Sequence, residues 1–167
     1  MLTGGIYMAI YTPEYKPNGN EVAVLTTDKG VIRVNLHGND APIHVGNFVE
    51  LAQKGYYDGL NFHRYEPGFV IQGGCPEGTG RGNPGYTIRE EFTTNPHNKH
   101  VDGTMAMARS QAPNSAGSQF YFCLGPQPFL DGGYTVFGDC ADAESIEVVH
   151  QLRRGDVIQS VVIENAN

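Results

Sequence analysis

Two polar side chains interrupt an otherwise apolar pattern in residues 61–74. Alternate positions around a central Pro-Gly pair are apolar or β-branched, which predicts two β-strands joined by a tight turn. Strand alternation puts Arg64 on the same face as Phe62, and Gln72 on the same face as Val70. A guanidinium offers several N–H donors in a rigid fork, and an amide offers both a donor and an acceptor. The two side chains are therefore either structural polar groups or a binding surface, and spacing alone favours the structural role.

This stretch resembles the signature of the cyclophilins, the peptidyl-prolyl cis-trans isomerases, which reads approximately FHRxxPxFxxQGG. The residues that match it are Phe62, His63, Arg64, Pro67, Phe69, Gln72, Gly73 and Gly74. Two further blocks follow in family order at Met105–Cys123 and Phe129–Gly138, and one extra residue before Pro113 is typical of bacterial members. The similarity covers residues 21–164. Three ordered blocks are more specific than one short motif, and they favour the binding-surface interpretation.

The resemblance implies rotation about Xaa-Pro bonds, which has an uncatalysed barrier of about 18–20 kcal/mol. Nothing is transferred in this reaction, so we expect no nucleophile, metal or cofactor. A donor aimed at the prolyl nitrogen and an apolar pocket around the ring would stabilise the twisted transition state. The resemblance assigns the donor to Arg64, with Gln72 supporting it or binding a substrate carbonyl. Proline-containing peptides and unfolded proteins are the expected partners.

The resemblance also implies a substrate-binding groove made of apolar walls, a backbone segment and a glutamine. Its expected residues are Phe69, Val70, Ala108, Arg109, Gln119, Tyr121, Phe129, Leu130 and Tyr134. Val70 and Tyr121 stand where methionine and phenylalanine are usual, and both keep an apolar wall, so we expect activity. Phe129 and Tyr134 replace the tryptophan and histidine of many eukaryotic members. Because the lost indole N–H is a donor to cyclosporin in the family, we expect only weak cyclosporin binding.

Length, charge and cysteine content limit the remaining function classes. A chain of 167 residues and 18.2 kDa predicts one domain with a substantial core. A net charge of −7 argues against nucleic-acid or anionic-membrane partners. We predict neither a membrane span nor a signal peptide. Three cysteines cannot all pair and match no metal motif, which favours free thiols and the cytoplasm. A monomer is the usual state in the family.

The periodicity predicts a mainly β fold. Residues 21–27 and 31–37 alternate around a turn and predict a β-hairpin. Further strands are expected at 104–109, 119–124, 134–139 and 157–164. Eight short strands and two helices predict a closed eight-stranded antiparallel β-barrel capped by two α-helices, which is also the cyclophilin-like fold that the resemblance implies. Because such a barrel is filled by its core, the groove is expected on its outer surface.

Two helices are expected, at residues 41–56 and 142–153, with Gly55 and Gly155 as their stop signals. Asp40 is the predicted N-cap of the first, with Pro42 just inside it. Residues 1–20 predict an N-terminal extension and residues 21–167 the isomerase domain. The extension is expected to be partly ordered by four side chains that lie on the domain, namely Ile6, Tyr7, Tyr11 and Tyr15.

Other candidate motifs have simpler interpretations. Residues 80–85 match G-x-G-x-x-G, but a proline within them and the lack of a strand-to-helix context favour a surface loop over a nucleotide site. His97 and His100 have no evident third ligand, so a solvated loop is favoured over a metal site. His63 is expected on the face opposite Arg64 as a hydrogen-bonded structural residue.

The serines and cysteines also lack the context of a nucleophile. Ser115 and Ser118 do not lie in G-x-S-x-G, which argues against a serine hydrolase. Cys123 is expected in the core, and Cys75, beside a glycine-rich loop, as an exposed thiol. The main alternative function is a proline-peptide binding or chaperone module that uses the same groove without catalysis. An intact Arg64 favours the enzyme, since a pure binder could lose it.

Overall fold

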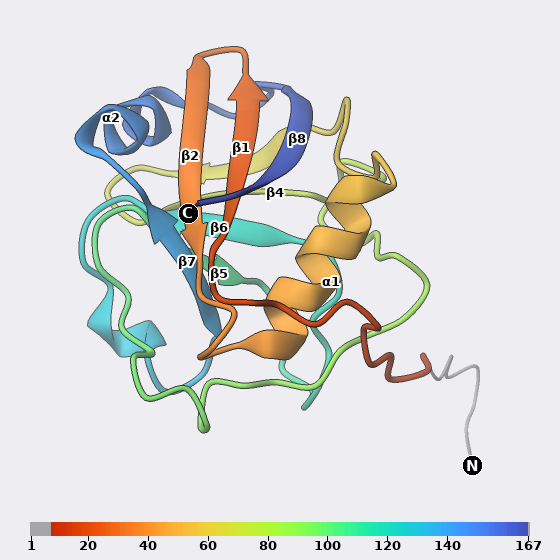
Figure 1. Cartoon of the computed structure of the whole chain (residues 1–167). Helices are drawn as coiled ribbons and strands as arrows, with labels where there is room; N and C mark the ends of the chain where they lie inside the picture. The colour runs from red at the N-terminus through yellow and green to blue at the C-terminus, as the bar shows by residue number, and fades with distance from the viewer. Residues whose placement is uncertain (1–7, 167) are drawn as a thin grey trace.

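The computed structural model describes residues 8–166, which form a single antiparallel sheet of eight strands with two α-helices (Figure 1). The strands follow the order β3-β4-β6-β5-β7-β2-β1-β8 in the sheet. Their bounds are β1 Glu21–Thr27, β2 Gly30–Leu36, β3 Phe62–Glu66, β4 Val70–Gly73, β5 Thr104–Met107, β6 Phe120–Cys123, β7 Val136–Cys140 and β8 Ile158–Asn165. The helices are α1 Pro42–Gln53 and α2 Ala143–Gln151, and a short 3-10 helix spans Pro128–Leu130. The predicted mainly β architecture is confirmed.

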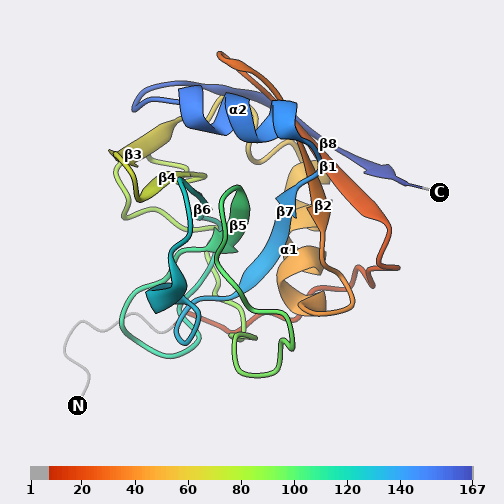
Figure 2. The ribbon, with the colours of Figure 1, turned by 90° about the vertical axis from the view of Figure 1, so that its left-hand side faces the viewer.

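The sheet curls into a half-barrel rather than a fully closed barrel (Figure 2). Its edges are β3 and β8, and between them runs only a short set of backbone hydrogen bonds that joins residues 59–62 to residues 155–158. Asn61 and Val157 form the single isolated bridge there. The prediction of full closure was therefore slightly too strong, because β3 and β8 form no ladder with each other beyond this contact in the described residues.

Strand alternation separates an inner core from an outer face of the sheet. The inner face supplies fully buried side chains such as Ile71, Met105, Phe120 and Phe122. Their sequence neighbours Val70, Ala106, Tyr121 and Cys123 belong to a second buried cluster. Side chains of successive strand residues point to opposite faces, so this second cluster lies outside the half-barrel. A groove on the outer face thus has its own apolar base.

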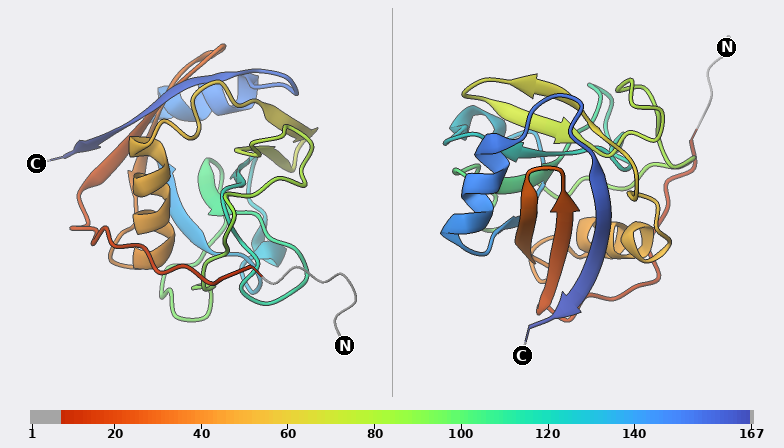
Figure 3. Two further views of the ribbon diagram at one scale, coloured as in Figure 1. Left: turned by 90° about the vertical axis from the view of Figure 1, so that its right-hand side faces the viewer. Right: turned by 90° about the horizontal axis from the view of Figure 1, so that it is seen from above.

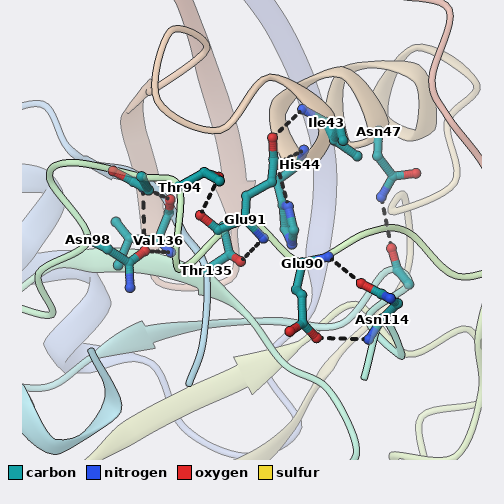
Figure 4. Close-up of polar contacts among 12 residues, drawn as sticks. Ile43, His44, Asn47, Glu90, Glu91, Thr94, Asn98, Asn114, Thr135 and Val136 are labelled. Atoms are coloured by element: carbon teal, nitrogen blue, oxygen red, sulfur yellow. Dashed lines mark hydrogen bonds and ion pairs between the residues drawn. The ribbon is translucent and has the colours of Figure 1, made fainter. Parts of the chain in front are cut away.

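Helix α1 is buried along most of its length, and its first turn is capped from a distant loop. Ala41 is the N-cap residue and makes no side-chain cap hydrogen bond. The backbone N–H groups of Ile43 and His44 instead donate to the Glu91 carboxylate at 3.1 and 2.8 Å (Figure 4). The predicted cap, Asp40, pairs with His97. The prediction was wrong because the carboxylate that meets the first turn comes from residues far along the chain.

Helix α2 packs against β2 and β7, well away from α1, which contacts β8 (Figure 3). Its N-cap Asp142 accepts a hydrogen bond of 2.7 Å from the backbone N–H of Ser145. Gly55 and Gly155 follow the two helices in the left-handed region, at φ of 73° and 95°. This conformation favours glycine, and Gly55 directly follows the C-cap of α1, as predicted. The prediction that Gly155 ends the second helix was wrong, because α2 already ends at Gln151, where its C-cap Leu152 takes an extended conformation.

Residues 9–20 lie along the domain. Tyr11 pairs its backbone N–H with Thr87 O, and its hydroxyl donates to Glu50 at 2.6 Å. Tyr15 donates its hydroxyl to Glu21 at 2.7 Å, and burial followed by this contact raises the pKa of Tyr15 to about 12. Ile6 and Tyr7, expected to hold the extension, lie outside the described residues. No helix among residues 8–166 has the length and apolar character to span a membrane.

Candidate active site

A β-bulge in β3 turns Arg64 toward the outer face of the sheet. Phe62 pairs with Gly73 and Arg64 pairs with Gln72, so β3 has one residue more than β4 over this step. Phe62 is fully buried in the inner core, whereas Arg64 is exposed. The prediction that these two side chains share a face was wrong. Regular alternation does not hold across a bulge.

The bulge brings Arg64 into register with residues from three other strands. Arg64 on β3 pairs with Gln72 on β4, and Gln72 in turn pairs with Tyr121 on β6. Tyr121 pairs with Ala106 on β5. Neighbouring strands lie about 4.8 Å apart, so this row crosses the outer face of the sheet within a short distance. Residues far apart in sequence therefore meet on one surface.

A pocket of about 290 Å³ lies over this row. Its lining contains every predicted site residue except Gln119: Arg64, Phe69, Val70, Gln72, Ala108, Arg109, Tyr121, Phe129, Leu130 and Tyr134. Val70, Tyr121 and Leu130 are buried and form its base, with Phe69, Ala108 and Tyr134 packed against them. Phe129 is 72% exposed and stacks on Phe69 with 5.6 Å between ring centroids. The pocket is mainly apolar, and Arg64 is one of its few polar groups.

Two glutamines orient the side of the pocket that Arg64 occupies. The Gln119 amide nitrogen donates to the carbonyl oxygens of Gly80 and Gly82 at 2.9 and 3.0 Å. Its oxygen then accepts from the Gln72 amide nitrogen at 3.0 Å. This leaves the Gln72 oxygen facing Arg64 Nη1 at 3.5 Å, a long hydrogen bond that holds the guanidinium only loosely. Gln119 itself lines an adjoining pocket together with Gln72.

Arg109 is held more firmly than Arg64. Its Nε donates to Gly133 O at 2.6 Å and its Nη1 to Ser110 O at 3.0 Å. The guanidinium carbon also lies 5.2 Å from the centre of the Tyr134 ring. Arg64, by comparison, lies 5.7 Å from the centre of the Phe69 ring. Arg109 is thus a fixed wall of the pocket, whereas the guanidinium of Arg64 keeps donors for a ligand.

The base of the pocket contains a hydrogen-bond chain that the sequence did not indicate. Asp131 accepts from His100 Nδ1 at 2.8 Å, and His100 Nε2 lies 2.9 Å from the Tyr121 hydroxyl. Because Asp131 fixes the proton on Nδ1, Nε2 is the acceptor and Tyr121 donates. Burial, opposed by Asp131, lowers the pKa of His100, and burial raises that of Tyr121. The imidazole of His100 and the hydroxyl of Tyr121 therefore both stay uncharged.

The position of His100 differs from the expectation that residues 97–100 form a solvated loop. The side chain of His100 is fully buried, whereas that of His97 is 74% exposed and pairs with Asp40. A solvated loop describes His97 but not His100. The hydrogen-bond partner of the buried His100 Nε2 is the hydroxyl that distinguishes Tyr121 from a phenylalanine, and Tyr121 lies on β6. A local spacing argument had no access to this contact.

Replacing Tyr121 with phenylalanine should lower the free energy of unfolding by about 1–3 kcal/mol. The change leaves His100 Nε2 as a buried acceptor without its donor. Denaturant unfolding followed by circular dichroism measures the difference. Tyr65→Phe is the control, since Tyr65 is a half-buried residue whose hydroxyl makes no hydrogen bond among residues 8–166. Equal losses in both variants would contradict the proposed contribution of the hydroxyl.

Two smaller expectations also need correction. Cys75 is 1% exposed, and its sulfur accepts from the backbone N–H groups of Gly80 and Gly82 at 3.3 and 3.2 Å. Burial raises the pKa of this thiol, but these backbone donors outweigh burial and lower it overall. The predicted exposed thiol is thus buried under its own loop. The other correction concerns His63, which is half-buried with an unpartnered Nδ1 and so lacks the expected hydrogen bond there.

Comparisons with known proteins agree with this geometry. The family model for "Cyclophilin type peptidyl-prolyl cis-trans isomerase/CLD" matches residues 22–167. A peptidyl-prolyl cis-trans isomerase of Synechococcus elongatus is 55% identical over 141 residues, which cover 84% of this chain and 94% of that protein. Peptidyl-prolyl cis-trans isomerase B of Bacillus subtilis is 46% identical over 140 residues, covering 84% and 95%.

A solved structure shares the fold. The cyclophilin type peptidyl-prolyl cis-trans isomerase of Cryptosporidium parvum, crystallised in the presence of the dipeptide Ala-Pro, superposes with a TM-score of 0.78 at 30% identity. The match covers 87% of this chain and 99% of that one. The family match, the relatives and the fold lead to one conclusion. The chain belongs to the cyclophilin family and is a peptidyl-prolyl cis-trans isomerase.

Proposed function

We propose that Arg64 is the catalytic donor and that the apolar pocket beside it holds the proline ring of the substrate. The observation that carries this proposal is the position of an exposed guanidinium at the rim of a pocket whose base is apolar. None of the ion pairs within residues 8–166 involves Arg64. Its N–H groups are therefore available to a substrate.

The reaction needs little more than this arrangement. As the Xaa-Pro bond twists, the prolyl nitrogen loses conjugation and gains a localised lone pair. A hydrogen bond from Arg64 to that lone pair is stronger in the twisted state than in either planar isomer, so it lowers the barrier. Phe69, Leu130 and Tyr121 would hold the ring while the rest of the chain turns. Gln72, aligned by Gln119, would position Arg64 or bind a substrate carbonyl.

The remaining members of the groove have supporting roles in the proposal. Val70 and Ala108 would complete the apolar contact surface, and Phe129 with Tyr134 would cover the sides of the bound segment. Arg109 would keep the backbone around residues 108–110 in place for pairing with an extended peptide. We propose no metal and no cofactor, because the rotation transfers no group.

The test is the cis-to-trans rate of a short Xaa-Pro peptide with and without the protein, measured beside its binding. Acceleration that saturates with peptide concentration supports the enzyme. Binding without acceleration would instead support the alternative, a module that recognises proline segments. A second substrate, a denatured protein whose refolding is limited by a prolyl bond, extends the test to folding assistance.

We propose that the chain acts as a monomer on unfolded or partly folded proteins in the cytoplasm. Its three cysteines are free and buried, which suits a reducing compartment. Burial followed by nearby carboxylates raises the pKa of Cys123 and of Cys140 to about 12, so these two thiols stay protonated. Light scattering of the purified protein measures the oligomeric state.

Cyclosporin should bind this protein weakly, and Phe129→Trp should strengthen the affinity. A phenylalanine ring cannot donate the hydrogen bond that an indole N–H supplies, and one neutral hydrogen bond corresponds to about a tenfold change in Kd. Calorimetric titration of both proteins measures the difference. Val162→Trp, at a position on β8 that is 53% exposed and outside the pocket lining, is the control for adding an indole. A nanomolar Kd for the unchanged protein would contradict the expectation.

A further inference from the structure

A second pocket adjoins the proposed proline pocket and differs from it in chemistry. It has a volume of about 270 Å³ and shares Gln72, Ala108 and Arg109 with its neighbour. Its other lining residues are small or polar and come from two loops, residues 80–83 and 110–119. An extended substrate rises about 3.3 Å per residue. A side chain within two or three residues of the bound proline can therefore enter this pocket.

The charged residues that line the two pockets all have one sign. Arg81 and Arg109 line the polar pocket, and Arg64 and Arg109 line the apolar one. No aspartate or glutamate appears in either lining, although the whole chain carries a net charge of −7. This surface is therefore a basic area on an acidic protein.

The arginines of these linings keep their charge available. None of the three takes part in an ion pair within residues 8–166. Arg109 donates to carbonyl oxygens, which leaves its positive charge uncompensated. Arg81 is exposed at the tip of the loop, with the Cys75-anchored Gly80 and Gly82 on either side. Its backbone is thus fixed while its guanidinium can reach a ligand.

We propose that the polar pocket selects substrates that carry a carboxylate side chain within three residues of the proline, with Arg81 as its principal partner. This inference rests on the proposed function of the adjoining pocket and names the class of peptide that it prefers. Guanidinium groups bind carboxylates in a bidentate geometry. The net negative charge of the protein would disfavour such peptides elsewhere on its surface, so the preference requires this local basic area.

The experiment measures kcat/KM for Xaa-Pro peptides in which glutamate, glutamine or lysine occupies each position from three before to three after the proline. At one position we expect glutamate to exceed glutamine by about three- to fivefold, and lysine to fall below glutamine. The difference should lie in KM, and it should shrink in 0.5 M salt because the pair is solvent-accessible.

Variants of Arg81 assign the preference to this residue. Arg81→Gln should reduce the glutamate-to-glutamine ratio to about one, and Arg81→Glu should invert it in favour of lysine. Arg89→Gln removes the same charge from an exposed arginine outside both pockets and should keep the wild-type ratio. Equal rates for the three residues at every position would overturn the inference, and so would a ratio that Arg81→Gln leaves intact. Failure to isomerise any peptide would instead refute the proposed function.

Discussion

Arg64→Ala should lower kcat/KM for an Xaa-Pro peptide by about two to three orders of magnitude while peptide binding changes much less. Removing one preorganised donor to the reacting group has an effect of this size in other enzymes. The apolar pocket stays intact in the variant because its base is made by Val70, Tyr121 and Leu130. Rates are measured by exchange spectroscopy on a proline peptide, and binding is measured by calorimetry on the same peptide.

Two further variants make this result specific to the hydrogen bond. Arg64→Lys keeps the charge but loses the fork of N–H donors, so its rate should lie between those of wild type and alanine. Arg153→Ala removes a different arginine that lies over an aromatic ring, Tyr65, at 4.7 Å and outside the pocket lining. Its rate should match wild type. If Arg64→Ala weakened binding and turnover equally, the arginine would act on the ground state and the catalytic proposal would fail.

Glu91→Ala should lower the free energy of unfolding by about 3 kcal/mol or more. The Glu91 carboxylate is 5% exposed and accepts two backbone N–H groups of α1 as well as His44 Nδ1 at 2.7 Å. Alanine would leave these donors buried without an acceptor, and each such group costs about 1–3 kcal/mol. Figure 4 shows that the contacts converge on one side chain. Chemical denaturation measures the loss.

Asp40→Ala is the matched comparison for Glu91→Ala. Asp40 is the acidic residue nearest the start of α1 in sequence, yet its side chain has only one hydrogen-bond partner in residues 8–166, the exposed His97. Its removal should cost less than about 1 kcal/mol, as is typical of exposed pairs. A larger loss for Asp40→Ala than for Glu91→Ala would mean that the local residue, and not the distant one, stabilises the first turn.

Arg64 and α1 show which features local sequence patterns could predict and which they could not. Alternation correctly placed Val70 and Gln72 on one face of β4, since that strand pairs regularly. It failed between Phe62 and Arg64, because the bulge in β3 adds a residue that no local composition signals. Helix periodicity located both helices, but it could not identify Glu91 as the cap, since that residue is 48 positions from Ile43.

The features of the pocket also fall into those that the sequence predicted and those that only the structure shows. The resemblance of short motifs selected every residue that lines the apolar pocket, because those motifs carry the side chains that contact substrate in the family. It did not indicate His100 and Asp131 beneath Tyr121, nor the burial of Cys75 under its loop. These features depend on which distant segment packs over a residue, and the same segment can be exposed or covered without any change in its own sequence.

The sequence by itself thus determined the family and the positions of most strands and helices, and it predicted the residues of the candidate site, because these depend on local periodicity and on motifs of fixed spacing. The tertiary structure decided the direction of Arg64, the partners of Tyr121 and the meeting of Arg81 with Arg109 around one pocket. The physical reason is that long-range pairing sets which side chains become neighbours. Neighbours in turn set burial, hydrogen bonding and the local density of charge.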